Sequence, residues 1–483
     1  MLGHLIKKEI LEHLMSLRFS IATVLCLIVI LCSLYVRGRQ YLQNLDDYHQ
    51  DTVATRTDME NERWPWRMAF GWKEVNLSPT PMKIFVRGID RDNRVTMKIA
   101  SNDTALEMLP DLVNTTEPLF PELDLVFFTG IIMSLLALIF GYDLVCGEKE
   151  RGTLKLVLSY NIPRDQVLLA KWVGGYVTLV LPYLIAVLAM MILLMTQPGI
   201  VLSSGQWNRL IGLVFLSLLY IASVYSLAVW ISTITHRAST SIIILATLWV
   251  VLILAIPNLS PHVARLMTSN ENTLDLNADR LAQRERIWQR DVVEKMRQYD
   301  KENGLGPNFK WRDLHWDDKA QRLIGRTRWL YKSERQAEAN EAIVTAAEKI
   351  DQKIQSTADA ELALNRWLAR LSPFGCFAMA AAELSDTGVA FRRRQLDQVN
   401  EFSKVLTAHG VQEHLSYIQL EIKDDGEQPP WRDVRAVIPR FNFVPPAAAE
   451  YVKWAAMDAG ILAALTVAFF MLSYIAFLRY DVR

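Results

Sequence analysis

Charged side chains of both signs are concentrated in one short segment of the 483-residue chain, residues 143–171, between two long apolar stretches. The segment contains Glu148, Lys149, Glu150, Arg151, Gly152 and Thr153, then the apolar run Leu154, Leu156, Val157 and Leu158, and then Pro163, Arg164 and Lys171. Carboxylates and guanidinium groups form strong ion pairs but cannot enter lipid, whereas the leucines avoid water. A short amphipathic helix at a membrane surface satisfies both demands. Gly152 would let the chain turn, and Pro163 would start the next helix.

The sequence contains none of the common patterns for nucleotide or hydrolytic chemistry. It has no GxxxxGK[ST] phosphate-binding loop and no GxSxG nucleophile elbow. His409 and His414 are five residues apart, whereas zinc hydrolase helices place two histidines four apart, and no third ligand is evident. We therefore expect surface histidines, with no catalytic residue, no metal site and no cofactor bound by this chain. The 52 basic residues balance the 52 acidic ones, which argues against a nucleic-acid-binding protein.

Asp458 is the one charged residue well inside a long apolar stretch. It follows Trp454 by four residues, so a helix would place it only about 6 Å inside that stretch. Two interpretations stay open for this possible intramembrane polar site. Asp458 could be a carboxylate near the interface that is paired across helices, or it could lie on a substrate path.

Six apolar stretches are long enough to cross a membrane as helices. Apart from Asp458 they carry no charge, and they lie at residues 19–36, 125–142, 172–195, 210–234, 238–257 and 454–478. The shortest have 18 residues, which a helix extends over about 27 Å, close to the thickness of the hydrocarbon layer. Lipid offers the backbone no hydrogen-bonding partner, so each stretch should be helical. We predict a mainly α membrane protein with six transmembrane helices, rather than a large soluble protein with buried helices.

The distribution of Lys and Arg predicts the orientation of these helices. Residues 1–18, 143–171, 235–237 and 479–483 fall on one side of the membrane and all carry basic side chains, whereas the short loop 196–207 on the other side carries none. Basic loops stay in the cytosol, so both termini are expected there. Residues 1–18 place leucine and isoleucine at helical spacing, which predicts a cytosolic helix lying in the interface.

Two large segments, residues 38–121 and 258–453, are then extracytoplasmic. In the first, Lys83–Val86 and Arg94–Ile99 alternate in polarity around Asp92–Asn93, which predicts a small β hairpin. In the second, apolar residues recur at helical spacing on both sides of a break at Gly304, Gly306 and Pro307. This pattern predicts a long antiparallel helical hairpin, and defects in its apolar seam indicate packing on a further element. Residues 372–391 are interrupted by acidic side chains and are expected to rest on the outer leaflet.

The charged segment resembles the coupling loop of permease subunits of type 2 ATP-binding-cassette (ABC) exporters. That loop is acidic, then reads E-R-G-T, then a leucine-rich stretch, a Pro-Arg or Ser-Arg pair, and a Lys. The matching residues are Glu148, Glu150, Arg151, Gly152, Thr153, Leu154, Leu158, Pro163, Arg164 and Lys171. The number of spans and the interfacial helix before the first one agree as well. Residues 258–453 depart from compact members, which keep a short re-entrant helical hairpin at that place.

The resemblance implies a bacterial cytoplasmic membrane protein that works as a dimer of permeases, either identical or homologous. Each permease would bind a separate ATPase subunit that carries the ATP and Mg²⁺, and would move a substrate outward or extract it from membrane lipid. An alternative is mechanotransmission, in which ATP hydrolysis moves the extracytoplasmic domain to act on an envelope protein without transport.

Overall fold

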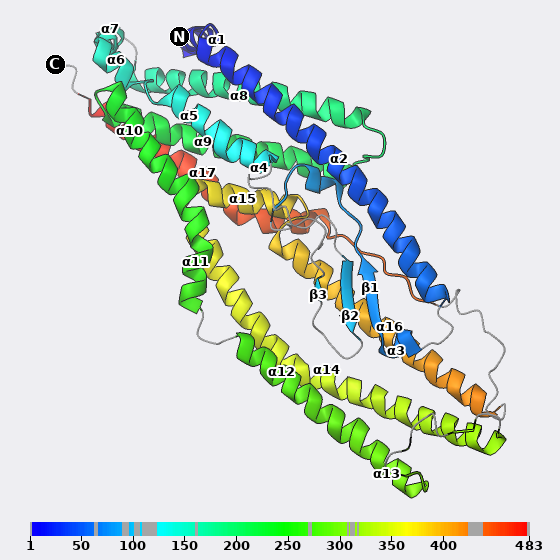
Figure 1. Cartoon of the computed structure of the whole chain (residues 1–483). Helices are drawn as coiled ribbons and strands as arrows, with labels where there is room; N and C mark the ends of the chain where they lie inside the picture. The colour runs from blue at the N-terminus through cyan, green and yellow to red at the C-terminus, as the bar shows by residue number, and fades with distance from the viewer. Residues whose placement is uncertain are drawn as a thin grey trace.

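The computed structural model is built almost entirely from helices. It describes residues 2–61, 66–88, 96–100, 107–108, 123–159, 163–268, 273–306, 309, 314–315, 318–423 and 438–480. Within these residues, six helical segments are long and apolar enough to cross a membrane, which confirms the predicted number of spans. The spans form one bundle, and a large helical domain continues from one end of it (Figure 1).

Every apolar stretch predicted from the sequence lies inside one of these six segments. They consist of α2 (Leu17–Asn61); α4 (Leu125–Phe127), the π-helix η2 (Phe128–Met133) and α5 (Ser134–Gly141); α8 (Arg164–Thr196); α9 (Ser204–Ile234); α10 (Ala238–Trp249), the π-helix η3 (Val250–Ala255) and α11 (Ile256–Thr268); and α17 (Ala448–Leu478). The most buried span is α9, which packs against α5 and α17. Small residues permit the close approach of α5, because a Cβ atom on Gly141 would lie 2.6 Å from that of Ala228.

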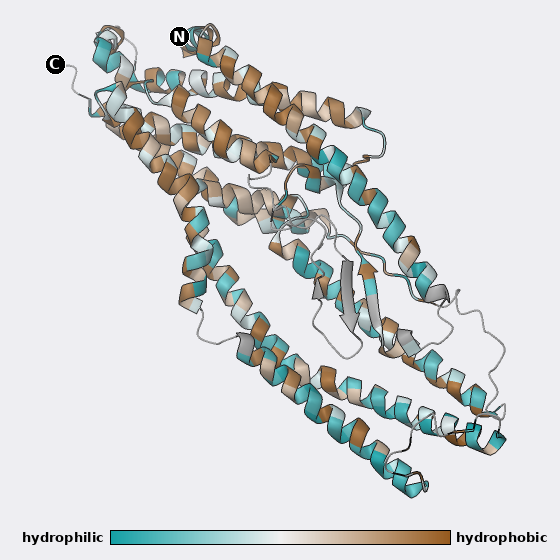
Figure 2. Ribbon diagram, viewed as in Figure 1, coloured by the Kyte–Doolittle hydropathy of each residue, from teal (hydrophilic) through white to brown (hydrophobic). Residues whose placement is uncertain are grey.

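Both chain termini lie at one end of the bundle, which we call the terminal face (Figure 1). The large domain lies at the other end and contains the second half of α2, the strands, helix α3 (Trp66–Phe70), and the helices formed by residues 273–302, 319–369 and 389–423. Hydropathy separates the two parts, since α2 changes from hydrophobic to hydrophilic along its length (Figure 2). With 45 residues, α2 extends over about 67 Å, so it leaves the bundle and enters the large domain as one helix.

The large domain contains a small antiparallel sheet, but its strands are not those of the predicted hairpin. Strand β1 (Trp72–Asn76) pairs with β2 (Thr96–Ala100), which pairs with β3 (Glu107–Met108). The strand predicted at Arg94–Ile99 therefore nearly coincides with β2. The strand predicted at Lys83–Val86 is wrong, because Pro81–Ile84 forms the 3₁₀ helix η1. The expected turn at Asp92–Asn93 lies outside the described residues.

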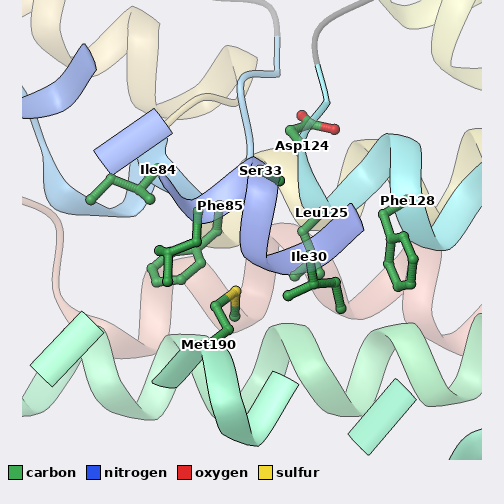
Figure 3. A pocket seen from close by; sticks show the side chains of 9 residues that line it. Ile30, Ser33, Ile84, Phe85, Asp124, Leu125, Phe128 and Met190 are labelled. Carbon is green, nitrogen blue, oxygen red and sulfur yellow. The ribbon is translucent and has the colours of Figure 1, made fainter. Parts of the chain in front are cut away.

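The 3₁₀ helix forms because its apolar side chains do not alternate between water and protein but are buried together. Met82, Ile84, Phe85 and Val86 are all buried at the outer end of the bundle. Figure 3 shows Phe85 beside Met190 of α8, with Ile30 of α2 close by. The Phe85 carbonyl accepts a 2.9 Å hydrogen bond from Leu125 N, which fixes the start of the second span. The cavity between these residues has a volume of only about 10 Å³, so it is a packing gap.

The predicted helical hairpin is present. Its first arm is α12 (Thr273–Trp288), the π-helix η4 (Gln289–Glu294) and α13 (Lys295–Glu302), and its second arm is α14 (Lys319–Ala369). Val292 and Met296 pack on Ala339 of α14, and Arg328 forms an ion pair with Asp300 at 2.7 Å. The further element that the seam defects predicted is α16 (Val389–Lys423), which also packs on α14.

Residues 372–391 do not rest on a membrane surface. Their helix α15 (Pro373–Leu384) is buried and packs against α9 and α17 inside the bundle. Ser372 donates a hydrogen bond to the carbonyl of Leu252, which lies midway along the fifth span. The end of α14 therefore enters the bundle, the chain turns at Ser372, and α15 leads back out, which is a re-entrant hairpin.

The acidic residues that argued against insertion are neutralised by cations from neighbouring helices. Glu383 forms an ion pair with Arg366, and Asp386 forms one with Arg209 of α9. Gly375 permits the tight turn, because a Cβ atom there would lie 2.1 Å from the Ala369 carbonyl oxygen. The chain thus has the re-entrant hairpin of the compact permeases in addition to the large domain.

Candidate functional site

The charged segment folds into two short helices at the terminal face, α6 (Cys146–Arg151) and α7 (Thr153–Ser159) (Figure 1). Gly152 separates them with a left-handed backbone (φ 75°), a conformation that other residues adopt only with strain. The start of α6 is held by α9, because Ser232 Oγ accepts hydrogen bonds from the Val145 and Cys146 amides at 3.0 and 3.1 Å. The predicted turn at Gly152 is therefore correct, and two helices replace the single one expected.

A buried ion-pair cluster joins α6 to α8 and to the N-terminal helix α1 (Leu2–Leu14). Lys171 Nζ lies 2.6 Å from Glu148 Oε1 and 3.1 Å from Glu9 Oε1. The Lys171 side chain is only 5% exposed, so its charge depends on these two carboxylates. A Cβ atom on Gly174 would lie 2.7 Å from the Cβ of Glu9, so the absence of a side chain lets α1 lie directly on α8.

Lys149 and Glu150, the next two residues of α6, each contact the end of a neighbouring span. In both cases the charge of the side chain is the one that this end of the helix favours. Lys149 Nζ donates to the carbonyls of Thr233 and Thr235 at the C-terminal end of α9, the latter at 3.2 Å. Glu150 Oε2 accepts a 3.0 Å hydrogen bond from the Ala238 amide at the first turn of α10. A cation at a helix C-terminus and an anion at a helix N-terminus both interact favourably with the helix dipole and so stabilise the helix.

Two arginines complete the connections. Arg164 Nη1 donates to the Leu478 and Tyr480 carbonyls, each at 3.0 Å, and so binds the end of α17. Arg18 of α2 pairs with Asp143 at 2.9 Å, just before α6. Because the second span continues directly into this segment, residues 143–171 are bonded to the same end of all six spans. The opposite side of the segment is open, since Arg151, Gly152, Thr153, Lys155 and Leu156 are exposed.

Comparison with known proteins identifies the family. The sequence model of the family described as ABC-2 family transporter protein matches residues 4–482. The chain belongs to the ABC-2 transporter family. It is also similar to two proteins named probable ABC transporter permease protein NosY, from Stutzerimonas stutzeri (38% identical) and Pseudomonas aeruginosa (39% identical). Each similarity extends over 102 residues, which are 19% of this chain and 37% of the relative.

This ABC-2 family protein is therefore a multi-pass membrane protein. Membership in a permease family is consistent with the expectation of a transport subunit that is not itself an enzyme. The comparison covers the chain from the interfacial helix to the end of the last span, so the large domain lies within the matched region.

Each predicted site residue of this ABC-2 protein can now be placed. Glu148, Glu150 and Arg164 bind neighbouring helices, Leu154 is fully buried, and Pro163 directly precedes α8. The apolar run is only partly shielded from water, however, because Leu156 is 66% exposed.

Sequence reasoning missed several side chains that bond within this site, among them Glu9, Arg18, Asp143, Lys149 in its capping role, and Ser232. Glu9 and Lys149 carry a detectable signal, since a charge in an interfacial helix or next to a span requires a partner. Ser232 carries none, because a serine inside an apolar helix usually bonds its own backbone.

Asp458 is buried and ion-paired with Arg370 at the end of α14, with Nε and Oδ1 2.5 Å apart. The partner belongs to the re-entrant hairpin, whose insertion the sequence did not predict.

The expectation of a surface histidine is wrong for His414. Its ring is fully buried between α14 and α16, where Nε2 lies 3.0 Å from Ser333 Oγ. Phe70 and Trp329 pack edge-on against the ring, so a neutral imidazole is accommodated in an aromatic environment. Burial lowers the pKa of His414 to about 4.

Proposed function

We propose that this chain is the membrane-spanning permease subunit of an ABC exporter, and that a separate ATPase binds α6 and α7. The observation that supports this proposal is the set of bonds between residues 143–171 and one end of all six spans. A movement of this segment would be passed to every span at once. The exposed residues from Arg151 to Leu156 would form the surface that the ATPase contacts.

Because of its ion pairs, this segment is suited to transmit force to the neighbouring helices rather than to bend. Lys171 is held by carboxylates from two other helices, and breaking such a buried pair costs about 3–5 kcal/mol. A push on α6 would therefore shift α1 and α8 with it before the contact yields. The terminal face would be cytosolic, where ATP and Mg²⁺ are bound by the partner subunit.

A second permease, identical or homologous, would pack against the spans that are least buried in the monomer. The fifth span has the smallest buried share, and it exposes Ile243, Val250 and Val251. A symmetric pair would bury such a face and leave the two ATPases side by side. The substrate would leave between the two permeases or be taken from the surrounding lipid.

The test is stimulation of the ATPase by the purified permease in lipid nanodiscs. Replacing an exposed contact residue, as in Arg151→Ala, is expected to lower stimulation at least about threefold, the loss that follows from one charge-assisted hydrogen bond across an interface. Arg286→Ala is the matched control, because Arg286 is also exposed but lies on α12 in the large domain. Equal stimulation by both variants would contradict the proposal.

Mechanotransmission remains the second candidate, and one observation favours it. Helix α14 has 51 residues, so it extends over about 75 Å from the re-entrant hairpin to the far end of the large domain. A shift of the spans could tilt this helix and act on an envelope protein. Proteoliposomes separate the two functions, because a mechanotransmitter hydrolyses ATP without moving solute or lipid.

A further inference from the structure

A cavity of about 420 Å³ lies at the junction of the bundle and the large domain. It is bordered by the N-terminal ends of α9 and α17, by the corner between α15 and α16, and by the extended segments 77–80 and 441–447. Its volume falls within the usual range for small-ligand sites. It is far from the terminal face, so it belongs to neither the ATPase surface nor the exposed fifth span (Figure 1).

The floor of the cavity is a polar cluster drawn from α9, from α17 and from the turn between α15 and α16. Arg209 binds Asp386 with two hydrogen bonds, of 2.5 and 3.2 Å, and its guanidinium group lies 4.0 Å from the ring centre of Tyr451. The Tyr451 hydroxyl donates to Asp386 at 2.6 Å. Asp386 has φ 61° and is the one residue other than glycine with positive φ in the described ranges. Such strained residues are enriched at binding sites.

Two hydrogen-bond donors at this cavity have no partner among the residues that the structure describes. The Thr80 hydroxyl is buried and unbonded in the described part of the chain. Gln206 uses its amide oxygen to cap α9 by accepting from Ser203 N at 2.8 Å, which leaves its NH₂ group available. The single carboxylate, Asp386, already accepts three hydrogen bonds. The cavity therefore offers donors and needs a ligand rich in acceptor oxygens.

The walls of the cavity consist of aromatic side chains and extended chain segments rather than charged side chains. Phe391, Phe441 and Phe443 line the cavity together with four prolines, Pro79, Pro81, Pro445 and Pro446. Segments 77–80 and 441–447 are neither helix nor strand. Val444 N and O are bonded to Gln398, and the Thr80 and Ala447 carbonyls accept bonds from Lys83 N and Glu450 N, so the remaining backbone groups are the ones that can pair with a ligand lying alongside.

These features decide between ligand classes. A carbohydrate needs acceptors for its hydroxyl protons, and the one carboxylate that lines the cavity, Asp386, already accepts three hydrogen bonds. A phosphate or an anionic lipid headgroup needs an uncompensated cation, and Asp386 neutralises Arg209. A peptide presents main-chain carbonyls to the donors and apolar side chains to the aromatic walls. We propose that this cavity binds an extended peptide segment on the extracytoplasmic side, and the proposal rests on the proposed function only for that orientation.

Photolabelling of the full-length permease in nanodiscs tests the proposal. The probe is a pool of N-acetylated, C-amidated tetrapeptides that carry a photoreactive phenylalanine analogue, and labelled residues are found by mass spectrometry. Labelling is expected in the segments that border the cavity. Thr80→Val removes only the unpartnered hydroxyl and should weaken binding about threefold to tenfold.

Ser78→Trp fills the cavity from an exposed position on its rim and should abolish labelling. Ser356→Trp is the matched control, since Ser356 is exposed on α14 outside the cavity, and it should label like the unmodified protein. Equal labelling of Ser78→Trp and the control would overturn the proposal. Competition by a neutral tetrasaccharide or by anionic lipid vesicles, but not by unlabelled peptide, would also overturn it.

The same peptides, joined as an exposed tail to a folded carrier domain, identify the source of the ligand. Binding of the free peptides alone indicates a small peptide in transit, whereas binding of the tailed carrier indicates a segment of another protein. The assay contains neither ATP nor ATPase, so a failed coupling experiment would leave its result unaffected.

Discussion

Lys171 shows how a single buried charge can hold three helices together. Its ammonium group lies between Glu9 of α1 and Glu148 of α6, and it is almost inaccessible to water. Lys171→Met leaves two partly buried carboxylates side by side without a cation, so we expect it to destabilise the protein by about 3 kcal/mol. Melting of the purified permease in detergent, followed by size-exclusion chromatography, measures the loss.

The matched variant is the triple replacement Glu9→Gln, Lys171→Met, Glu148→Gln. It removes all three charges together and should recover most of the lost stability, because no buried charge is left uncompensated. ATPase stimulation should stay low in the triple variant if the ion pairs carry force as well as stability. A triple variant as unstable as Lys171→Met would show that the cluster contributes through packing alone.

Among the elements, the re-entrant hairpin depends most on one contact with a span. Arg370 at the end of α14 binds Asp458 of α17, and both side chains are largely buried. Arg370→Met and Asp458→Asn should each lower stability by about 3 kcal/mol, whereas the double variant should lose clearly less than their sum. A double-mutant cycle on thermal stability measures this coupling. Additive losses would mean that the two residues do not support each other.

The contact between α14 and α16 contains two buried groups with opposite pH dependence. Burial raises the pKa of Glu421 to about 7 although Arg326 lies 3.2 Å away, and burial lowers the pKa of His414 to about 4. A raised carboxyl pKa contributes stability below its unfolded value of 4.5, and that contribution is lost as the pH rises through 7. The lowered histidine pKa contributes stability above 6.5 that is lost as the pH falls through 4.

The unmodified protein should therefore lose stability at this contact as the pH rises from about 5 to about 8. Glu421→Gln should abolish that loss. Hydrogen exchange of α16 amides, corrected for the intrinsic effect of pH, is the measurement. Glu401→Gln is the control, because Glu401 is on the same helix but exposed. If Glu421→Gln retains the pH dependence of the unmodified protein, the carboxylate is not its source.

The elements that the sequence predicted correctly are those whose own residues determine their structure. A run of 18 or more apolar residues strongly favours a membrane helix over a buried helix of a soluble protein, and the seam in α14 required a partner helix. The errors at Lys83–Val86 and at residues 372–391 concern segments whose environment comes from distant residues. Arg366 and Arg209 neutralise the charges that made insertion of α15 look impossible, and their pairing could not be read from spacing along the chain.

At the scale of the molecule, continuous helices connect the terminal face to the large domain. The helix α2 passes through the bundle and on into the large domain, and the re-entrant end of α14 is bonded to α17, whose other end is bonded to Arg164. The bonds at the terminal face and the cavity beside Arg209 are therefore parts of one mechanical framework. Helix α9 itself joins the two sites, because its C-terminal end holds α6 through Ser232 and its N-terminal end carries Arg209.

This arrangement requires that the terminal face and the large domain lie on opposite sides of the membrane, with the terminal face inside. Basic residues surround α6 and α7, whereas the loop 196–207 has none, so the cytosol is the expected location of α7. In a chain with its four cysteines replaced, Lys155→Cys should react with a membrane-impermeant maleimide only after the cells are permeabilised. Ser356→Cys on α14, which is equally exposed, should react in intact spheroplasts. The reverse pattern would place the ATPase surface outside the cell and exclude a cytosolic ATPase partner.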